Sequence, residues 1–378
     1  MMRAISVFFL ALALGRAQDQ PQSIPAFLDT GNAAYMKGDY PAARAAYMKA
    51  WELADQPPQD DPVRYDIAKK LSGVCAAQGS IADAETYLDR AILFRENAYG
   101  SNDPKLADDL IIQSGFYRSL KAYDRAREIL GRVVGIHRQA FGPESTALAD
   151  DFSRIARIYL DEKKLNAAVG PLKTALEIRT KAVGPLDGTL IPDLDRLANA
   201  HLTMHDYDQS EAVYRHALII RETILGKDDA DLIATVDGLA YSCFGLQKYD
   251  EAEALYKRLI DLWVKSVQED HPMVSVALDK LASFYVDRKK LDQAKELTDK
   301  SIAIRAHFLA LGLSVAATEQ INEQHKDAAM GMYRRAVNAM EPVHPLNTEL
   351  HDAIAGMIKT TETPTKPATK GPRPERKK

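Results

Sequence analysis

Self-similarity at a fixed spacing of 42 residues is the feature of this sequence that most restricts its fold. Six consecutive blocks begin at positions 63, 105, 147, 189, 231 and 273, and they align without a gap. The tenth residue of every block is small (Ser72, Ser114, Ala156, Ala198, Ala240, Ala282), and so is the twenty-second (Ala84, Ala126, Ala168, Ser210, Ala252, Ala294). A period of this length is typical of repeat arrays, in which each unit packs on its neighbours.

Two groups of apolar residues at helical spacing occur in each block, as in Leu194 and Leu197 followed by Ala217 and Ile220. We therefore expect each block to be an antiparallel helical hairpin, with the small residues where its helices cross. The thirtieth position is large and apolar in all six blocks, which indicates a core column. Aspartates at the start of the second helix, such as Asp250, are expected to accept hydrogen bonds from its free amides.

These patterns resemble the tetratricopeptide-repeat family, and the 42-residue spacing resembles the subclass typified by kinesin light chains. The residues that carry the resemblance include Leu239-Ala240-Tyr241, Tyr249 to Tyr256, and Ala217 to Gly226. It covers about residues 26–341. The resemblance implies an all-α fold: an α-solenoid, built as a right-handed superhelix of antiparallel helical hairpins whose first helices line a concave groove. The family often has paired asparagines before the Leu-Ala of the first helix, whereas this sequence has pairs such as Asp237-Gly238.

The two ends of the chain depart from the block pattern. Arg3, an apolar run, and small residues at Gly15 and Ala17 predict a signal peptide over residues 1–17, and hence a periplasmic or secreted protein. The apolar run is too short to cross a hydrocarbon core of ~30 Å, so no stable membrane insertion is expected after cleavage. The other segments are interpreted as a short linker (18–25), a degenerate hairpin (26–62), the six blocks (63–314), a degenerate hairpin with a capping helix (315–360), and a disordered basic tail rich in Pro, Thr and Lys (361–378).

Several classes of function are disfavoured by the sequence. The tail holds six basic residues against two acidic ones in a chain of net charge −4, so the folded body is acidic and no nucleic acid is expected to bind it. No phosphate loop, dinucleotide fingerprint, nucleophile elbow or zinc-protease motif occurs, so we predict no enzyme activity, no catalytic residue and no cofactor. His201 and His205 lack a third ligand, so no metal site is predicted. Cys75 and Cys243 share the thirteenth position, four repeats apart, and are expected to be buried free thiols.

The candidate partner-binding residues lie on the first helices of the blocks. Aspartates recur at the seventh position of blocks four to six, and polar or aromatic residues follow one turn later. Basic residues lie in the first half of the array, so the groove is expected to be mixed in charge at one end and acidic at the other. The candidates are Lys69, Arg118, Arg157, Asp195, Asn199, Asp237, Tyr241, Asp279, Ser283 and Asp287. The alternative is that the aspartates only complement helix dipoles, as the basic column at position 33 is expected to do at the other helix end.

The sequence therefore predicts a non-enzymatic scaffold that binds a partner protein or peptide in the concave groove. The alternative is a structural or assembly factor that acts through its convex face or through self-association. Neither pattern nor composition favours one oligomeric state.

Overall fold

The computed structural model describes residues 23–56, 61–319, 326–341 and 348–362. The expected signal peptide and nearly all of the basic tail lie outside these residues, although Thr361 and Glu362 belong to the last helix. The described residues form α-helices, two short 3-10 helices and turns, and they contain no strand. The all-α prediction is confirmed for this part of the chain.

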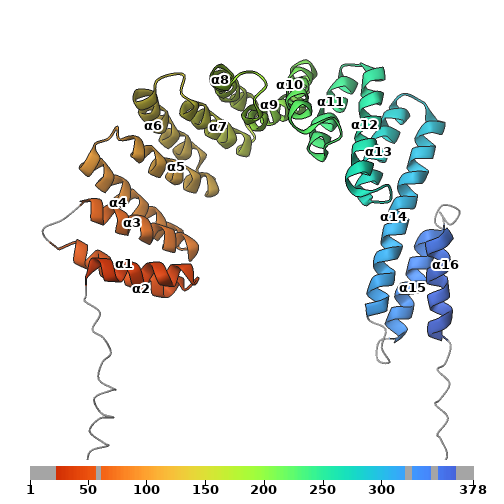
Figure 1. Ribbon diagram of the computed structural model, residues 1–378, viewed down its shortest axis with the longest axis horizontal. Helices are drawn as coiled ribbons and strands as arrows, with labels where there is room; N and C mark the ends of the chain where they lie inside the picture. The colour runs from red at the N-terminus through yellow and green to blue at the C-terminus, as the bar shows by residue number, and fades with distance from the viewer. Residues whose placement is uncertain (1–22, 57–60, 320–325, 342–347, 363–378) are drawn as a thin grey trace, which may run out of the picture. The chain divides into compact units, whose positions relative to one another are not determined.

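Residues 1–185 form the first of two units, and its helices pack in chain order as successive hairpins (Figure 1). The helices are α1 (Ile24–Met36), α2 (Tyr40–Ala54), α3 (Asp61–Ala77), α4 (Ile81–Tyr99), α5 (Pro104–Ser119), α6 (Tyr123–Phe141), α7 (Thr146–Asp161) and α8 (Leu165–Val183). From α3 onward, odd-numbered helices are the first helices of the blocks and even-numbered helices are the second helices.

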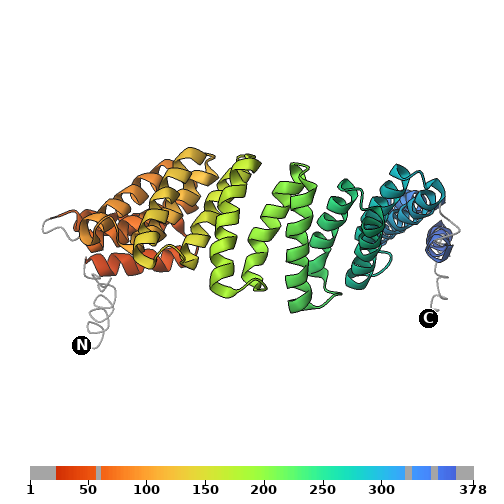
Figure 2. The same ribbon diagram turned by 90° about the horizontal axis from the view of Figure 1, so that it is seen from above.

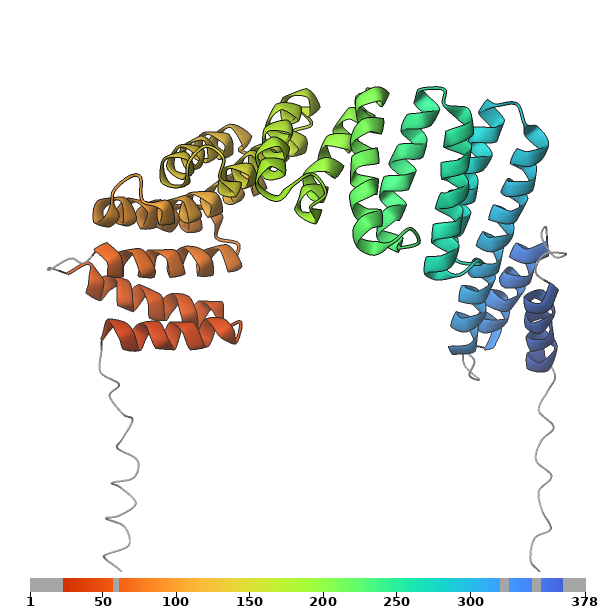
Figure 3. The ribbon, with the colours of Figure 1, turned by 45° about the horizontal axis from the view of Figure 1, so that its top comes forward.

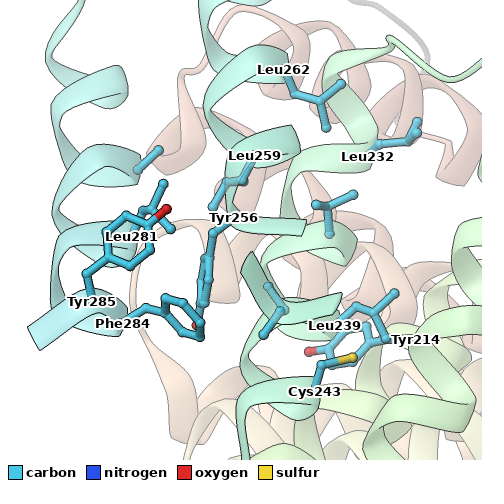
Figure 4. Close-up of a cluster of buried hydrophobic side chains, with 14 of the residues drawn as sticks. Tyr214, Leu232, Leu239, Cys243, Tyr256, Leu259, Leu262, Leu281, Phe284 and Tyr285 are labelled. Atoms are coloured by element: carbon cyan, nitrogen blue, oxygen red, sulfur yellow. The ribbon is translucent and has the colours of Figure 1, made fainter. Parts of the chain in front are cut away.

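Residues 186–378 form the second unit, which continues the same alternation (Figure 2). It contains η1 (Gly188–Leu190), α9 (Ile191–Thr203), α10 (Tyr207–Leu225), η2 (Ala230–Leu232), α11 (Ile233–Gly245), α12 (Tyr249–Val267), α13 (Pro272–Asp287), α14 (Leu291–Glu319), α15 (Lys326–Met340) and α16 (Thr348–Glu362). Its core is a continuous cluster of buried side chains from α9 to α14, part of which Figure 4 shows around Tyr256 and Phe284.

The small columns lie where the sequence places them, at the crossing of the two helices of each hairpin. All twelve side chains are buried. Two hydrogen bonds join the columns directly: Ser72 Oγ donates to the Ala84 carbonyl at 2.8 Å, and Ser210 Oγ donates to the Ala198 carbonyl at 3.2 Å. The helices therefore approach closely enough for a short side chain to reach the opposite backbone.

The turn inside each block is made by a left-handed residue at position 17. This residue is Gly79 in block one but a non-glycine residue in the other five blocks, with φ between 58° and 61° (Lys121, Lys163, His205, Gln247, Lys289). The capping expectation is wrong for blocks two, four and five, because this turn makes Asp124, Asp208 and Asp250 the second residues of their helices, and the N-cap residues form no side-chain cap bond. In block five, for example, the N-cap residue is Lys248. Asp39 does cap α2, accepting from the Ala42 amide at 3.1 Å.

The turn between blocks uses position 38, in a conformation that glycine alone adopts readily. Four blocks have glycine there, with φ between 85° and 91° and ψ between 162° and 172° (Gly100, Gly142, Gly184, Gly226). Gln268 adopts the same conformation in block five, with φ 79° and ψ 162°. Block six has Ala310 instead, which stays helical.

Because no residue ends it at position 38, α14 runs for 29 residues. Residues 315–319, which the sequence analysis assigned to a separate hairpin, therefore continue α14. Figure 3 shows α14 extending past α13 to pack beside α15. By length and composition α14 is also the one described helix that could cross a membrane, but a core helix meets the same criteria.

Candidate partner-binding surfaces

The outward face of the first helices in the second unit carries the predicted polar and aromatic residues. Asn199, Tyr241 and Ser283 all occupy position 11, on α9, α11 and α13, and all three are exposed. The Tyr241 side chain is 45% exposed, and its ring lies 6.2 Å from that of Tyr207. Asp287 is exposed one turn beyond Ser283. The structure thus presents a recurring polar stripe that leaves an aromatic ring open to a partner.

The three seventh-position aspartates are half-buried, and each is paired with a cation. Asp195 accepts two hydrogen bonds from Arg221, at 2.8 and 2.6 Å, in a bidentate pair. Asp279 pairs with Arg305, which also occupies position 33 of its own block. Asp237 instead pairs with Lys280 of the next block. Because each aspartate is paired with a cation, the three do not form the strongly acidic strip that the sequence predicted.

The basic candidates of the first unit lie on three different first helices. Lys69 of α3 donates to Asp109 at 2.8 Å and to the Tyr65 hydroxyl at 3.0 Å. Arg118 of α5 lies 3.5 Å from the Asp161 carboxylate. Arg157 of α7 is exposed. Lys69 and Arg118 therefore take part in ion pairs between helices.

In blocks one and two the position-33 residue also links its block to the next, in addition to any effect on helix dipoles. Arg95 Nε lies 2.9 Å from Asp109, which also accepts from Tyr65. In the next block His137 Nδ1 lies 2.7 Å from the buried carboxylate of Asp151. Burial raises the pKa of Asp151, and the hydrogen bond from His137 opposes that effect only in part. The buried acids at position 5, Asp109 and Asp151, therefore hold neighbouring blocks together.

One cluster in the described part of the chain has the residue types and spacing to hold a metal ion: Glu211, Cys243 and Glu251. Arg215 already donates to Glu211 at 2.7 Å and to Glu251 at 2.5 Å, and Lys248 donates to Glu211 at 2.7 and 2.6 Å. Burial raises the pKa of Cys243 to about 11, so this residue is a thiol at neutral pH. The two cations neutralise the two carboxylates, and the cluster is an ionic link between repeats.

The two histidines considered as metal ligands, His201 and His205, bind different side chains. His201 lies 2.9 Å from Asp206, whereas His205 lies 2.8 Å from the Tyr207 hydroxyl. Cys75 and Cys243 are free and buried, as predicted.

Three hollows among the described residues lie between successive second helices, with the intervening first helix as the floor. They occur between α4 and α6, between α6 and α8, and between α12 and α14. These hollows were not predicted, because the position-30 side chains fit a core column. In the structure these side chains range from the buried Ile92 to Ile302, which is 45% exposed. The sequence signal for the groove between α12 and α14 was Gln268, which stands where four other blocks have glycine.

Comparison with known proteins agrees with this architecture. Tetratricopeptide-repeat family models match residues 114–147, 194–231 and 232–306. No curated protein matches the sequence. The chain is a tetratricopeptide-repeat protein. Its 42-residue period resembles that of the kinesin-light-chain-like type.

Solved structures with a similar arrangement have low sequence identity to the chain. Kinesin-light-chain TPR-like repeats of Podosopora anserina are 19% identical, with a TM-score of 0.48, over 55% of this chain and 98% of that one. BtubC (BKLC) of P. vanneervenii is 19% identical, with a TM-score of 0.47, over 64% and 92%. The apo form of RapI is 18% identical, with a TM-score of 0.45, over 75% and 97%.

Proposed function

We propose that this protein is a non-enzymatic scaffold that binds a segment of a partner protein along the first-helix face of its second unit. The observation that carries the proposal is the position-11 stripe of Asn199, Tyr241 and Ser283, which recurs every 42 residues and is exposed on three successive first helices. Repeat arrays use such extended faces for binding because each repeat adds contacts of the same kind.

The pairing of the aspartates refines the partner that this face fits. Asp195, Asp237 and Asp279 are engaged with Arg221, Lys280 and Arg305, so alternating charge borders the stripe. A partner segment with polar side chains, and with one aromatic or aliphatic residue to pack on Tyr241, suits this surface better than a uniformly basic one. Charged contacts at the rim would contribute about 0.2–1 kcal/mol each and would be screened by salt.

We also propose that the protein acts outside the cytoplasm. Support comes from the short positive start, the apolar run and the small residues at Gly15 and Ala17. The partner would then be an exported or surface protein of the same cell, or a protein in its surroundings.

A pull-down with two matched baits tests the binding proposal. The mature chain is compared with a variant carrying Asn199→Ala, Tyr241→Ala and Ser283→Arg, using extracts of the exported fraction. We expect proteins that the first bait retains and the second loses, while both baits show equal far-UV circular dichroism and thermal unfolding. Equal recovery by both would refute binding at this face. Light scattering on the free baits checks the assembly alternative, which a concentration-independent multimer would favour.

A further inference from the structure

The groove between α12 and α14 has an apolar floor and apolar walls. It encloses about 910 Å³. Its floor is formed by Leu278 and Leu281 of α13, and its walls carry four half-buried aliphatic side chains, Ile260, Val264, Leu297 and Ile304. It is the largest of the three hollows named above.

Two other pairs of successive second helices are bridged by an ion pair that this groove lacks. Between α4 and α6, Glu96 at position 34 pairs with Arg132 at position 28 of the next block. Between α10 and α12, Glu222 and Arg258 form the same pair at 2.7 Å. In block five, position 34 is Val264.

The basic residue opposite Val264 therefore has no acidic partner across the groove. Lys300, at position 28 of block six, pairs instead with Glu296 of its own helix at 2.8 Å. Because the bridge is absent, the apolar walls of the α12–α14 groove remain accessible along their length.

The same block holds a strained residue at the end of the groove. Gln268 adopts the backbone conformation that glycine adopts in four other blocks, and its side chain lines the groove. A non-glycine residue in this region costs about 1–3 kcal/mol, and such residues cluster at ligand-binding sites. The amide that Gln268 supplies there is a hydrogen-bonding group that glycine would not provide.

The rim of the groove is acidic. Asp261 and Glu269 form no ion pair within the described residues, whereas the two rim lysines, Lys257 and Lys300, are held by Glu253 and Glu296. His307, at the same end of the groove as Gln268, lies 3.8 Å from Asp270. A ligand with basic groups on its flanks would therefore complement this rim.

The geometry points to one kind of ligand: we propose that the α12–α14 groove binds an amphipathic helix of a partner protein, with aliphatic or aromatic residues on one face and Lys or Arg on its flanks. The wall of α14 extends from Gln293 to His307, which at 1.5 Å per residue is about 21 Å, or four turns of a bound helix. A helix satisfies its own backbone hydrogen bonds, whereas an extended segment would find only helices, with no sheet edge, to receive its amides. The chain's own tail, 363–378, has no large aliphatic or aromatic residue to fill the groove.

This second site lies between second helices, whereas the proposed function uses the exposed face of the first helices. The two proposals can therefore fail independently. The probe is a fluorescein-labelled 16-residue peptide with leucine at helical i, i+3, i+4 and i+7 spacing, lysine on the flanks and alanine elsewhere. Anisotropy titration measures its affinity for the full mature chain. A second peptide has glutamate in place of lysine, and a third has serine in place of leucine. We expect the lysine peptide to bind at least tenfold more tightly than either control.

Variants locate the peptide on the protein. Val264→Glu installs the missing acid opposite Lys300 and should weaken binding at least tenfold. Ile219→Glu, at an exposed site of α10, adds the same charge outside the groove and should leave the affinity within twofold of wild type, as should Tyr241→Ala. If Val264→Glu lowers thermal stability, Ile304→Ser tests the other wall and should also weaken binding.

Three results would overturn the proposal. They are failure of the lysine peptide to bind the wild-type chain, equal binding by the lysine and glutamate peptides, and undiminished binding by both groove variants. A wild-type dimer that Val264→Glu abolishes, in the absence of peptide binding, would assign the groove to a second copy of the chain instead.

Discussion

Gln268→Gly should stabilise the protein, because it replaces a strained residue with the one that four other blocks use. Glutamine at φ 79° and ψ 162° costs about 1–3 kcal/mol. Glycine removes that strain, but it also raises the conformational entropy of the unfolded chain, which lowers the stability by about 0.4–1 kcal/mol. The difference predicts a net stabilisation of about 0.5–2 kcal/mol. The reverse change, Gly226→Gln, imposes the same strain at the corresponding position of block four and should destabilise by a similar amount.

Urea unfolding followed by circular dichroism measures both changes. Repeat arrays unfold through neighbouring interfaces and can depart from two-state behaviour, so midpoints are compared among variants of one chain. Lys163→Gly is a useful control, since position 17 is left-handed but less restricted than position 38. A Gln268→Gly midpoint at or below that of wild type would show that the strain argument is wrong.

Three further expectations can be checked separately. Ala240→Leu should destabilise by ~1–3 kcal/mol because it overfills a fully buried helix crossing, whereas Ala230→Leu, at an exposed 3-10 turn, should change the thermal midpoint little; equal shifts would mean that the register is wrong. The hydrogen bond from Lys257 is the main cause that lowers the pKa of Glu253 to about 2, so its stabilisation is present above about pH 4.5 and is lost as pH falls towards 2. Glu253→Gln should make acid unfolding less steep in that window, and an unchanged profile would contradict this role. Intact-mass analysis of exported protein should find an N-terminus immediately after Ala17, and retention of Met1 would argue against export.

The repeat period was enough to predict the helices and their crossings. Positions 10 and 22 require small residues because the two helices of one hairpin meet there. The hydrogen bond from Ser72 to the Ala84 carbonyl shows how closely the helices approach. Such contacts repeat whenever the block repeats. The length of α14 could also have been predicted, because Ala310 stands where four other blocks have a glycine that ends the helix.

Side-chain pairing was less predictable, because a long side chain at a fixed position has several acids within reach. Asp195 pairs with Arg221 in its own block, whereas Asp237 pairs with Lys280 in the next, although both aspartates occupy position 7. The α12–α14 groove was missed for a related reason. Periodicity shows that Ile260 belongs to an apolar column, but how far the side chain is covered depends on the neighbouring helices, which periodicity does not describe.

The regular offset between contacts has a consequence for how such a chain can change length. The longest side-chain contact described above, between Tyr65 and Asp109, joins residues 44 positions apart, so each block contacts little beyond its immediate neighbours. Removing 42 residues, from any position in one block to the same position in the next, would join two surfaces that already match. A chain built in this way can be shortened or lengthened by whole blocks through recombination between its own repeats, and natural variants with one block fewer or more would keep the same helix crossings.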